Sequence, residues 1–249
     1  MTFEPPLLVI APIRDGFDLA HMPWSETAKE RISVNSAKFD GLDMIEIIFD
    51  SMPFLLTFHT ATETKKRFSD ERFEALFCGP PTSYESAIAI TPRDILTSGR
   101  HLPEVNHRTL LLGKWVGDSL SAISAAWIPS RRIASFAFFR EVVADYLTGG
   151  PFPVTFQTSF SEVRQGCYVT KGLNYFSGQE IRLTTPPDYS ASDISERLVR
   201  IIDDITTHGA IDAPSRAKGM IDGETLTFST GDDREYLDII IENHATTTG

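Results

Sequence analysis

The sequence predicts an α+β fold in which two ferredoxin-like halves of the βαββαβ type pack together, with mostly antiparallel sheets. Short strand-like runs alternate with segments of helical periodicity along the whole chain. Hydrophobic residues make up 41% and charged residues 23%, which are ordinary values for a globular protein. A chain of 249 residues can bury a full core. We expect an N-terminal half at 1–100 and a C-terminal half at 101–249, either separate or forming one continuous domain.

Local signals in the first half give the order β-α-β-β-α-β, which is the split βαβ pattern of ferredoxin-like sandwiches. Apolar runs of strand length are separated by proline-containing turns, and serines stand where helices would begin. The expected elements are a strand at Leu7–Pro12, a helix at Ser25–Ile32, strands at Met44–Phe49 and Phe54–Thr60 joined by a hairpin turn, a helix at Asp70–Phe77 capped by Ser69, and a strand at Ser86–Thr91.

The second half also mixes helices and strands. Its expected elements are a helix from Asn106 to Leu120, a strand at Ala122–Ile128, a helix at Phe136–Leu147 capped by Ser135, strands at Val154–Phe160, Cys167–Thr170 and Glu180–Leu183, a helix from Ser190 to His208, and strands at Gly219–Ile221, Glu224–Ser229 and Tyr236–Ile241. The glycine-rich turn between Thr170 and Glu180 predicts close backbone packing. Asp222-Gly223 is a strong hairpin signal.

The clearest helix begins at Ser190, which has capping-box spacing to Asp193. An apolar stripe marks its inner face: Ile194, Leu198, Ile201, Ile202 and Ile205. We expect its outer face to carry Glu196, Arg197, Arg200 and Asp203.

Three groups of short motifs resemble those of one bacterial family. They are Ala125-Ala126-Trp127-Ile128-Pro129 followed by Phe136–Val143; Thr170-Lys171-Gly172-Leu173 with Gly178-Gln179-Glu180-Ile181; and Asp222-Gly223-Glu224-Thr225. In this order they resemble the DUF4261 group of bacterial proteins, over about Ile123 to Ser229. The chain departs from that pattern at Ser177-Gly178, where one glycine is more usual, and in a longer approach to the last hairpin. The resemblance implies a fold but no enzymatic activity and no catalytic residues.

Negative charge is concentrated toward the C-terminus. The net charge is −11, and residues 184–249 contain five basic and thirteen acidic side chains. Such a surface repels nucleic-acid phosphates and anionic lipids and attracts basic partners. The N-terminus lacks a basic leader, and no apolar run approaches the length that spans a bilayer. We therefore expect a cytoplasmic protein with no nucleic-acid or membrane partner.

Catalytic and metal-binding motifs were not found in the sequence, so we assign no catalytic residue, metal site or cofactor. Ser119 lies in an incomplete nucleophile-elbow motif and is better placed on a helix. His59 lies in an apolar strand, where a hydrogen-bonded core residue is commoner than a general base. Glu180 and Glu224 are expected on strands of one sheet, where they would form a shared pocket with Arg182 or Lys171 or an ordinary cross-strand ion pair.

The leading hypothesis for function is a non-catalytic protein-binding module, an immunity protein that neutralises a basic toxin effector through an acidic surface. The acidic residues proposed for this surface are Asp203, Asp232, Asp233, Glu235 and Asp238. One alternative is a hydrolase whose site is assembled from distant residues such as His59, Glu180 and Glu224. Another is a small-ligand or scaffold module. Oligomeric state is left open.

Overall fold

The protein is described here by a computed structural model, which covers residues 4–14, 17–22, 24, 32–35, 44–79, 85–93, 96, 99–231 and 235–243. The chain divides into two compact units, an N-terminal unit, Met1–Phe156, and a C-terminal unit, Gln157–Gly249. Each unit contains helices and a sheet, and most strand pairs are antiparallel. The predicted α+β class is therefore confirmed. The division falls at 156/157 and not near residue 100, because strands on both sides of residue 100 share one sheet.

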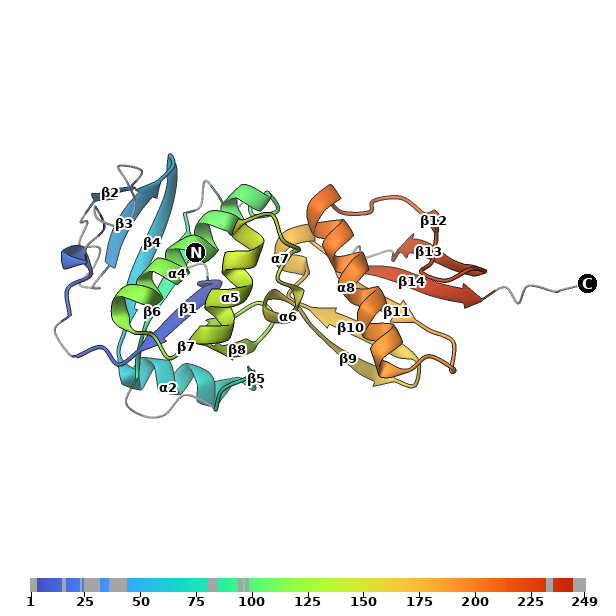
Figure 1. The fold of residues 1–249 in the computed structure, drawn as a ribbon, viewed down its shortest axis with the longest axis horizontal. Helices are drawn as coiled ribbons and strands as arrows, with labels where there is room; N and C mark the ends of the chain where they lie inside the picture. Colours follow the sequence, from blue (N-terminus) through green and yellow to red (C-terminus); the bar gives the residue numbers. More distant parts are fainter. Residues whose placement is uncertain are drawn as a thin grey trace, which may run out of the picture. The chain divides into compact units, whose positions relative to one another are not determined.

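The N-terminal unit is built on an eight-stranded sheet (Figure 1). In sheet order its strands are β2 (Ile32–Asn35), β3 (Met44–Phe49), β4 (Met52–His59), β6 (Ser86–Pro92), β1 (Leu7–Ala11), β7 (Ser124–Trp127), β8 (Arg132–Ser135) and β5 (Glu74–Leu76). Only the pairing of β5 with β8 is parallel among the described strands of this sheet. The central strand β1 is buried at all five positions. The ferredoxin-like arrangement of the halves stays a prediction.

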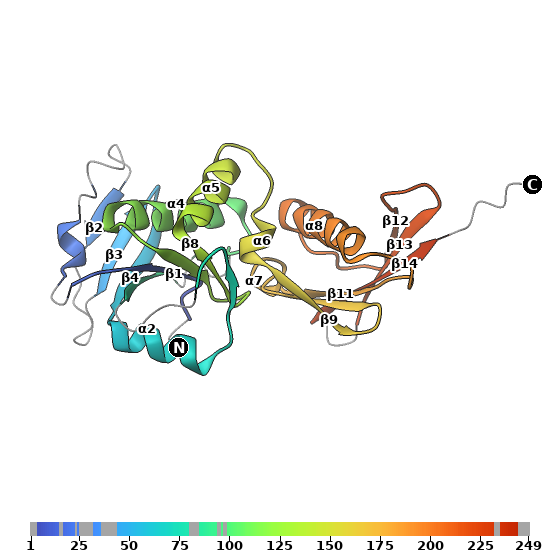
Figure 2. The same ribbon diagram turned by 60° about the horizontal axis from the view of Figure 1, so that its bottom comes forward.

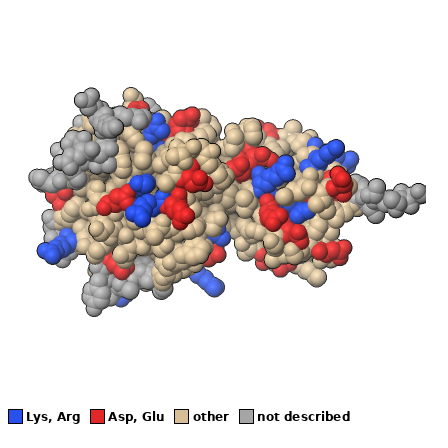
Figure 3. Space-filling view, viewed as in Figure 1, with Lys and Arg blue, Asp and Glu red and all other residues tan. Residues whose placement is uncertain are grey.

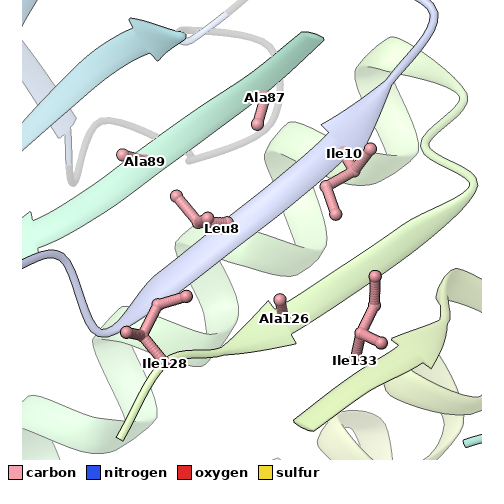
Figure 4. Close-up of a cluster of buried hydrophobic side chains, with 7 residues drawn as sticks. All are labelled: Leu8, Ile10, Ala87, Ala89, Ala126, Ile128 and Ile133. Carbon is pink, nitrogen blue, oxygen red and sulfur yellow. The ribbon is translucent and has the colours of Figure 1, made fainter. Parts of the chain in front are cut away.

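Helices cover both faces of this sheet (Figure 2). On one face lie α4 (Pro103–Leu120) and α5 (Phe136–Leu147), and on the other lies α2 (Ala61–Asp70). The core on the α2 side contains small and branched side chains from β1, β6, β7 and β8 and the turn after β7 (Figure 4): Leu8, Ile10, Ala87, Ala89, Ala126, Ile128 and Ile133. Phe68, Phe73 and Cys78 pack against it. On the other face Gly113 allows α4 to approach β1, because a Cβ there would lie 2.4 Å from Leu7 Cδ2.

Several predicted elements of this unit are confirmed. Strands β1, β3 and β6 lie where expected, and Ser135 caps α5 by accepting a hydrogen bond from the backbone N–H of Phe138. The predicted β3–β4 hairpin is also present. Its turn is only Asp50-Ser51, which have φ values of 49° and 66°. Two consecutive positive φ values define the tight turn that fits strand twist. The expected helix at 25–32 falls at 25–31 outside the described residues, and Ile32 begins β2.

The predicted helix at Asp70–Phe77 is wrong. The helix is α2, which begins nine residues earlier, and Glu74–Leu76 form the edge strand β5. A capping box fixes the start of α2: Glu63 N–H donates to Thr60 Oγ1 at 3.3 Å, and Thr60 N–H donates to Glu63 Oε2 at 2.8 Å. Likewise α4 begins at Pro103, not at Asn106, which is buried inside the helix.

The C-terminal unit is a six-stranded sheet with a long helix on one face (Figures 1 and 2). In sheet order its strands are β12 (Ser215–Lys218), β13 (Glu224–Thr230), β14 (Tyr236–Asn243), β11 (Glu180–Thr184), β10 (Cys167–Lys171) and β9 (Ser159–Arg164). Strands β11 and β14 are parallel, and the other described pairs are antiparallel. Helix α8 (Ala191–His208) packs its apolar stripe toward the sheet and begins with the predicted Ser190–Asp193 capping box.

Two predicted strands of the second half are displaced. Residues Val154–Gln157 form the short helix α6, and the strand is β9, which begins at Ser159. The strand expected at Gly219–Ile221 is β12, which ends at Lys218. Between β10 and β11 the turn contains one helical turn, α7 (Asn174–Ser177); near the N-terminus a 3-10 turn, η1 (Leu19–His21), precedes β2. No helix in the described ranges is long and apolar enough to cross a membrane.

Candidate functional site

The acidic residues proposed for binding lie on different faces of the C-terminal unit. Asp203 is on α8, whereas Asp238 is on β14 between the buried residues Leu237 and Ile239. Because side chains alternate along a strand, Asp238 points away from the face that α8 covers. Glu235 is exposed just before β14, and Asp232 and Asp233 lie outside the described residues. On the face that Figure 3 shows, basic and acidic side chains are interspersed.

Asp238 also has a local cation. Arg182 Nη1 donates to Asp238 Oδ1 at 3.2 Å, and the Arg182 guanidinium lies 4.3 Å from the ring centroid of Tyr236. Both residues of the ion pair are partly exposed, so the pair contributes little to stability. The Arg182 cation also partly neutralises the negative charge that Asp238 would offer to a basic partner.

Glu180 is committed to the turn that follows β10. Its carboxylate accepts hydrogen bonds from Thr170 Oγ1 at 2.7 Å and from the backbone N–H groups of Gly172 at 2.7 Å, Leu173 at 3.2 Å and Asn174 at 3.2 Å. Thr170 Oγ1 in turn accepts from the Ile181 N–H at 2.7 Å. The Glu180 carboxylate therefore connects the start of α7 to β10 and β11. This connection explains why Thr170 and Gly172 precede Glu180 by ten and eight positions.

Glu180 and Glu224 are not neighbours, contrary to our expectation. Glu180 pairs with Tyr236 at the start of β14, and Glu224 pairs with Asn243 at its end. Those partners are seven positions apart along β14, about 24 Å in an extended strand. Glu224 also points toward α8 with the buried residues of β13. The predicted shared pocket and the cross-strand ion pair are both wrong.

Glu224 instead forms a buried ion pair with Arg197 of α8. Arg197 Nε lies 3.0 Å from Glu224 Oε1, and the two side chains are 5% and 0% exposed. Tyr189 Oη lies 2.9 Å from Glu224 Oε2, and its ring lies 4.4 Å below the Arg197 guanidinium. Arg197 Nη1 donates to the Asp193 carbonyl at 2.9 Å. Every charged atom at the centre of this cluster thus has a partner.

The surroundings of Arg197 and Glu224 favour the charged form of both side chains. Burial raises the pKa of Glu224, but the hydrogen bonds from Arg197 and Tyr189 outweigh it and leave the pKa lowered. The hydrogen bonds to Glu224 raise the pKa of Arg197 in spite of its desolvation. An ionised, fully paired glutamate is suited to hold α8 against β13, not to abstract a proton.

Sequence reasoning placed Arg197 on the outer face of α8, and this was wrong. Arg197 follows Ile194 by three residues and precedes Ile201 by four, so it falls on the apolar stripe. Helical spacing alone predicts that Arg197 faces the sheet. The expectation of an exposed position came from the charge of its side chain. Tyr189, which precedes the helix, was also missed.

A pocket of about 180 Å³ adjoins the ion pair, between α8, β12 and β13. Its apolar lining includes Ile201 of α8 and Leu226 and Phe228 of β13. Arg200 and Lys218 also line it, and neither has an ion-pair partner within the described part of the chain. Asp204 lines the pocket too, and Lys218 lies opposite Thr225, whose side chain faces away from α8. The pocket thus combines an apolar floor with one arginine and one aspartate of α8.

The N-terminal unit has an open hollow of about 370 Å³ beside His59 and α2. Burial lowers the pKa of His59. The neighbouring charges have structural partners, since Glu63 belongs to the capping box and Arg67 pairs with Glu4. This arrangement is a solvated helix face with a half-buried histidine.

Ser119 lies in α4, as expected. In the same helix His107 packs edge-on against Tyr146, with the ring centroids 4.3 Å apart. Within the described ranges, no three side chains of His, Cys, Asp and Glu are grouped to hold a metal ion.

Comparison with protein-family models, with curated proteins and with solved structures found no match for this chain. The functional proposal is therefore based on the geometry of the C-terminal unit. Its distinctive features are the buried Arg197–Glu224 pair and the pocket beside it, next to the edge strand β12.

Proposed function

We propose that this chain is a non-catalytic protein-binding module, namely a bacterial immunity protein that neutralises a toxin effector. The observation that carries the proposal is the edge of the C-terminal sheet, where β12 is exposed at all four residues and adjoins the apolar pocket. Two exposed apolar side chains follow β12, Met220 (41% exposed) and Ile221 (53% exposed). Exposed strand edges and apolar side chains beside them are common protein-docking features.

Charge supports the same proposal through the rate of encounter. Residues 157–249 contain eight basic and fifteen acidic side chains, a net charge of −7. A field of this sign steers a basic partner toward the C-terminal unit. The acids on α8 and around β14, including Asp203, Glu235 and Asp238, contribute to the field from several sides. In this proposal they speed association, while the β12 edge holds the complex.

The hydrolase alternative has less support, because the two glutamates that it required are committed to structural contacts. Glu180 accepts one hydrogen bond from Thr170 of β10 and three from the turn that follows, and Glu224 is paired with Arg197.

Two further parts of the proposal come from the sequence. Motifs between Ile123 and Ser229 support kinship with the DUF4261 group, which permits an immunity role and brings no catalytic residues. The proposal also places the protein in the bacterial cytoplasm, where an immunity protein meets an incoming toxin.

The test begins with the gene next to the one encoding this chain in its own genome. The neighbouring product is expressed alone and together with this chain, and growth of the host is measured. We expect toxicity that this chain relieves, and a complex that survives co-purification. A non-toxic neighbour, or toxicity without relief and without a complex, would contradict the proposal.

The charge argument is tested on the purified pair by stopped-flow measurement of the association rate. We expect the variant Asp203→Asn/Glu235→Gln/Asp238→Asn to associate several-fold more slowly than wild type at low salt, and the difference to vanish at high salt. A matched control removes three exposed acids from the N-terminal unit: Glu104→Gln/Glu141→Gln/Asp145→Asn. Equal slowing by both variants would show that only the net charge matters.

A further inference from the structure

We propose that the pocket between α8, β12 and β13 binds a branched-chain α-amino acid in its zwitterionic form. In this assignment Arg200 binds the carboxylate of the ligand, Asp204 binds its ammonium group, and the apolar floor contacts its side chain. The inference goes beyond the proposed function, because it adds a small-molecule site to the C-terminal unit and does not depend on a toxin.

The pocket exists because the residue of β12 that faces α8 at this point is small. Ala217 lies opposite Leu226 of β13, and residues directly opposite each other in an antiparallel pair share one face of the sheet. Leu226 is buried on the face that α8 covers, so the methyl group of Ala217 points to the same side. A methyl group leaves space between α8 and the edge of the sheet, and the volume of this space is about 180 Å³.

The floor of the pocket offers contacts for one aliphatic side chain. Ile201 of α8 and Leu226 and Phe228 of β13 line the pocket and are themselves buried. The Arg197–Glu224 ion pair also lines it, and the two charges of that pair neutralise each other. The volume is smaller than the roughly 300–1,000 Å³ of pockets for drug-sized molecules, so the pocket suits a ligand no larger than a single amino acid.

Two further side chains of α8 at the pocket carry opposite charges. Arg200 and Asp204 are one helical turn apart, a spacing at which residues of opposite charge often pair. Across the residues that the structure describes, neither of these side chains forms an ion pair. Both are therefore available to a ligand that has a group of each sign.

This arrangement of charges favours a zwitterion over a simple ion. An anion that contacts Arg200 also meets Asp204, in a unit whose net charge is −7. A cation that contacts Asp204 meets Arg200 in the same way. An α-amino acid carries both charged groups on one carbon, so it can accept hydrogen bonds from the guanidinium and donate them to the carboxylate without adding net charge.

The test titrates the full chain with L-leucine by isothermal calorimetry, and three analogues of leucine are measured alongside. Isocaproate lacks the ammonium group, isoamylamine lacks the carboxylate, and glycine lacks the apolar side chain. We expect saturable binding of leucine and at least about tenfold weaker binding of each analogue, because each loses either charge-assisted hydrogen bonds or the apolar contacts. Absence of saturable binding by leucine, isoleucine and valine would overturn the inference. Isocaproate or isoamylamine that binds as tightly as leucine would overturn the zwitterion assignment.

Charge variants test which residue binds which end of the ligand. Arg200→Gln and Asp204→Asn should each weaken leucine binding about tenfold. The first should leave binding of isoamylamine unchanged, and the second should leave binding of isocaproate unchanged. Glu196→Gln, at an exposed position of the same helix outside the pocket, is the matched control and should bind leucine normally. Unchanged leucine affinity in both pocket variants would overturn the roles of Arg200 and Asp204.

A third variant fills the pocket. Ala217→Leu places a larger side chain in the space that faces α8 and should abolish leucine binding. Arg216→Leu introduces the same residue opposite Thr227, on the face of the sheet away from α8, and should bind leucine normally. Circular dichroism and urea midpoints check that both variants are folded. Equal leucine affinity of Ala217→Leu and the wild type would show that the ligand does not occupy this pocket.

The outcomes separate this inference from the proposed function. Leucine binding by a chain whose genomic neighbour is not toxic would support the amino-acid site and contradict only the immunity role. A toxin complex formed by a chain that binds no branched-chain amino acid would overturn the site and leave the immunity role intact.

Discussion

Arg197 and Glu224 form an ion pair inside the C-terminal unit, with Arg197 Nε 3.0 Å from Glu224 Oε1 and 3.1 Å from Glu224 Oε2. The pair joins α8 to β13 through two residues that are 27 positions apart in the sequence. Burial of two charges costs free energy, which the mutual attraction and the added contacts of Tyr189 offset. The pair therefore fixes where α8 sits on the sheet, and with it the width of the pocket between α8 and β12.

Arg197→Met is expected to lower the free energy of unfolding by about 3–5 kcal/mol, because it leaves the Glu224 carboxylate buried without its cation. The double variant Arg197→Met/Glu224→Met should recover most of that loss, because no charge remains buried. Urea denaturation followed by circular dichroism measures both. A double variant no more stable than the single variant would contradict this account of the pair.

Glu180→Gln is expected to lower stability by about 1.5–3 kcal/mol, because an amide NH₂ replaces one of the two oxygens that accept hydrogen bonds. The backbone N–H groups of Gly172, Leu173 and Asn174 should then exchange with deuterium faster than in the wild type. Glu196→Gln, at an exposed position on α8, is the matched control and should change neither quantity. Unchanged exchange in Glu180→Gln would show that this carboxylate does not hold the turn.

Thr60→Ala is expected to destabilise the N-terminal unit by about 0.5–2 kcal/mol, because the Glu63 N–H at the start of α2 loses its acceptor. Thr62→Ala, within the exposed first turn of the same helix, makes the same chemical change without removing a cap. Its effect should be near zero or slightly stabilising, since alanine favours helix. Equal urea midpoints for the two variants would contradict the capping role.

His59 predicts a pH dependence of stability. Burial lowers its pKa from the ordinary value of 6.5, so the unfolded chain takes up a proton at higher pH than the folded chain. The contribution of neutral His59 to folding stability is fully present above about pH 6.5 and is lost as the pH falls through the pKa of the folded state. We expect the melting temperature of His59→Gln to depend less on pH between 5 and 7 than that of the wild type. Parallel curves would mean that another group titrates in this range.

Elements with local signals were predictable from the sequence. Helices α5 and α8 combine a capping serine with an apolar stripe, and both were predicted to within a residue at each end. Strands β10 and β11 were predicted because apolar residues alternate on either side of a glycine-rich turn. In each case the residues that set the boundary lie within a few positions of it.

Elements that depend on distant partners were not predictable in the same way. Strand β5 is three residues long and exists because it pairs with β8, whose Arg132 lies 58 positions after Glu74. Strand β8 itself was missed. The burial of Arg197 depends on Glu224, which the sequence alone does not place opposite α8. The pocket was missed for the same reason, because its lining comes from α8, β12 and β13.

The turn after β10 has a consequence for ligands. Backbone N–H groups that converge at the start of a helix are the usual receptors for nucleotide phosphates. Here Glu180 supplies the anion from within the chain, at the high effective concentration of a tethered competitor. A free phosphate would have to displace it and leave a carboxylate without donors, so this turn is closed to nucleotides by its own sequence.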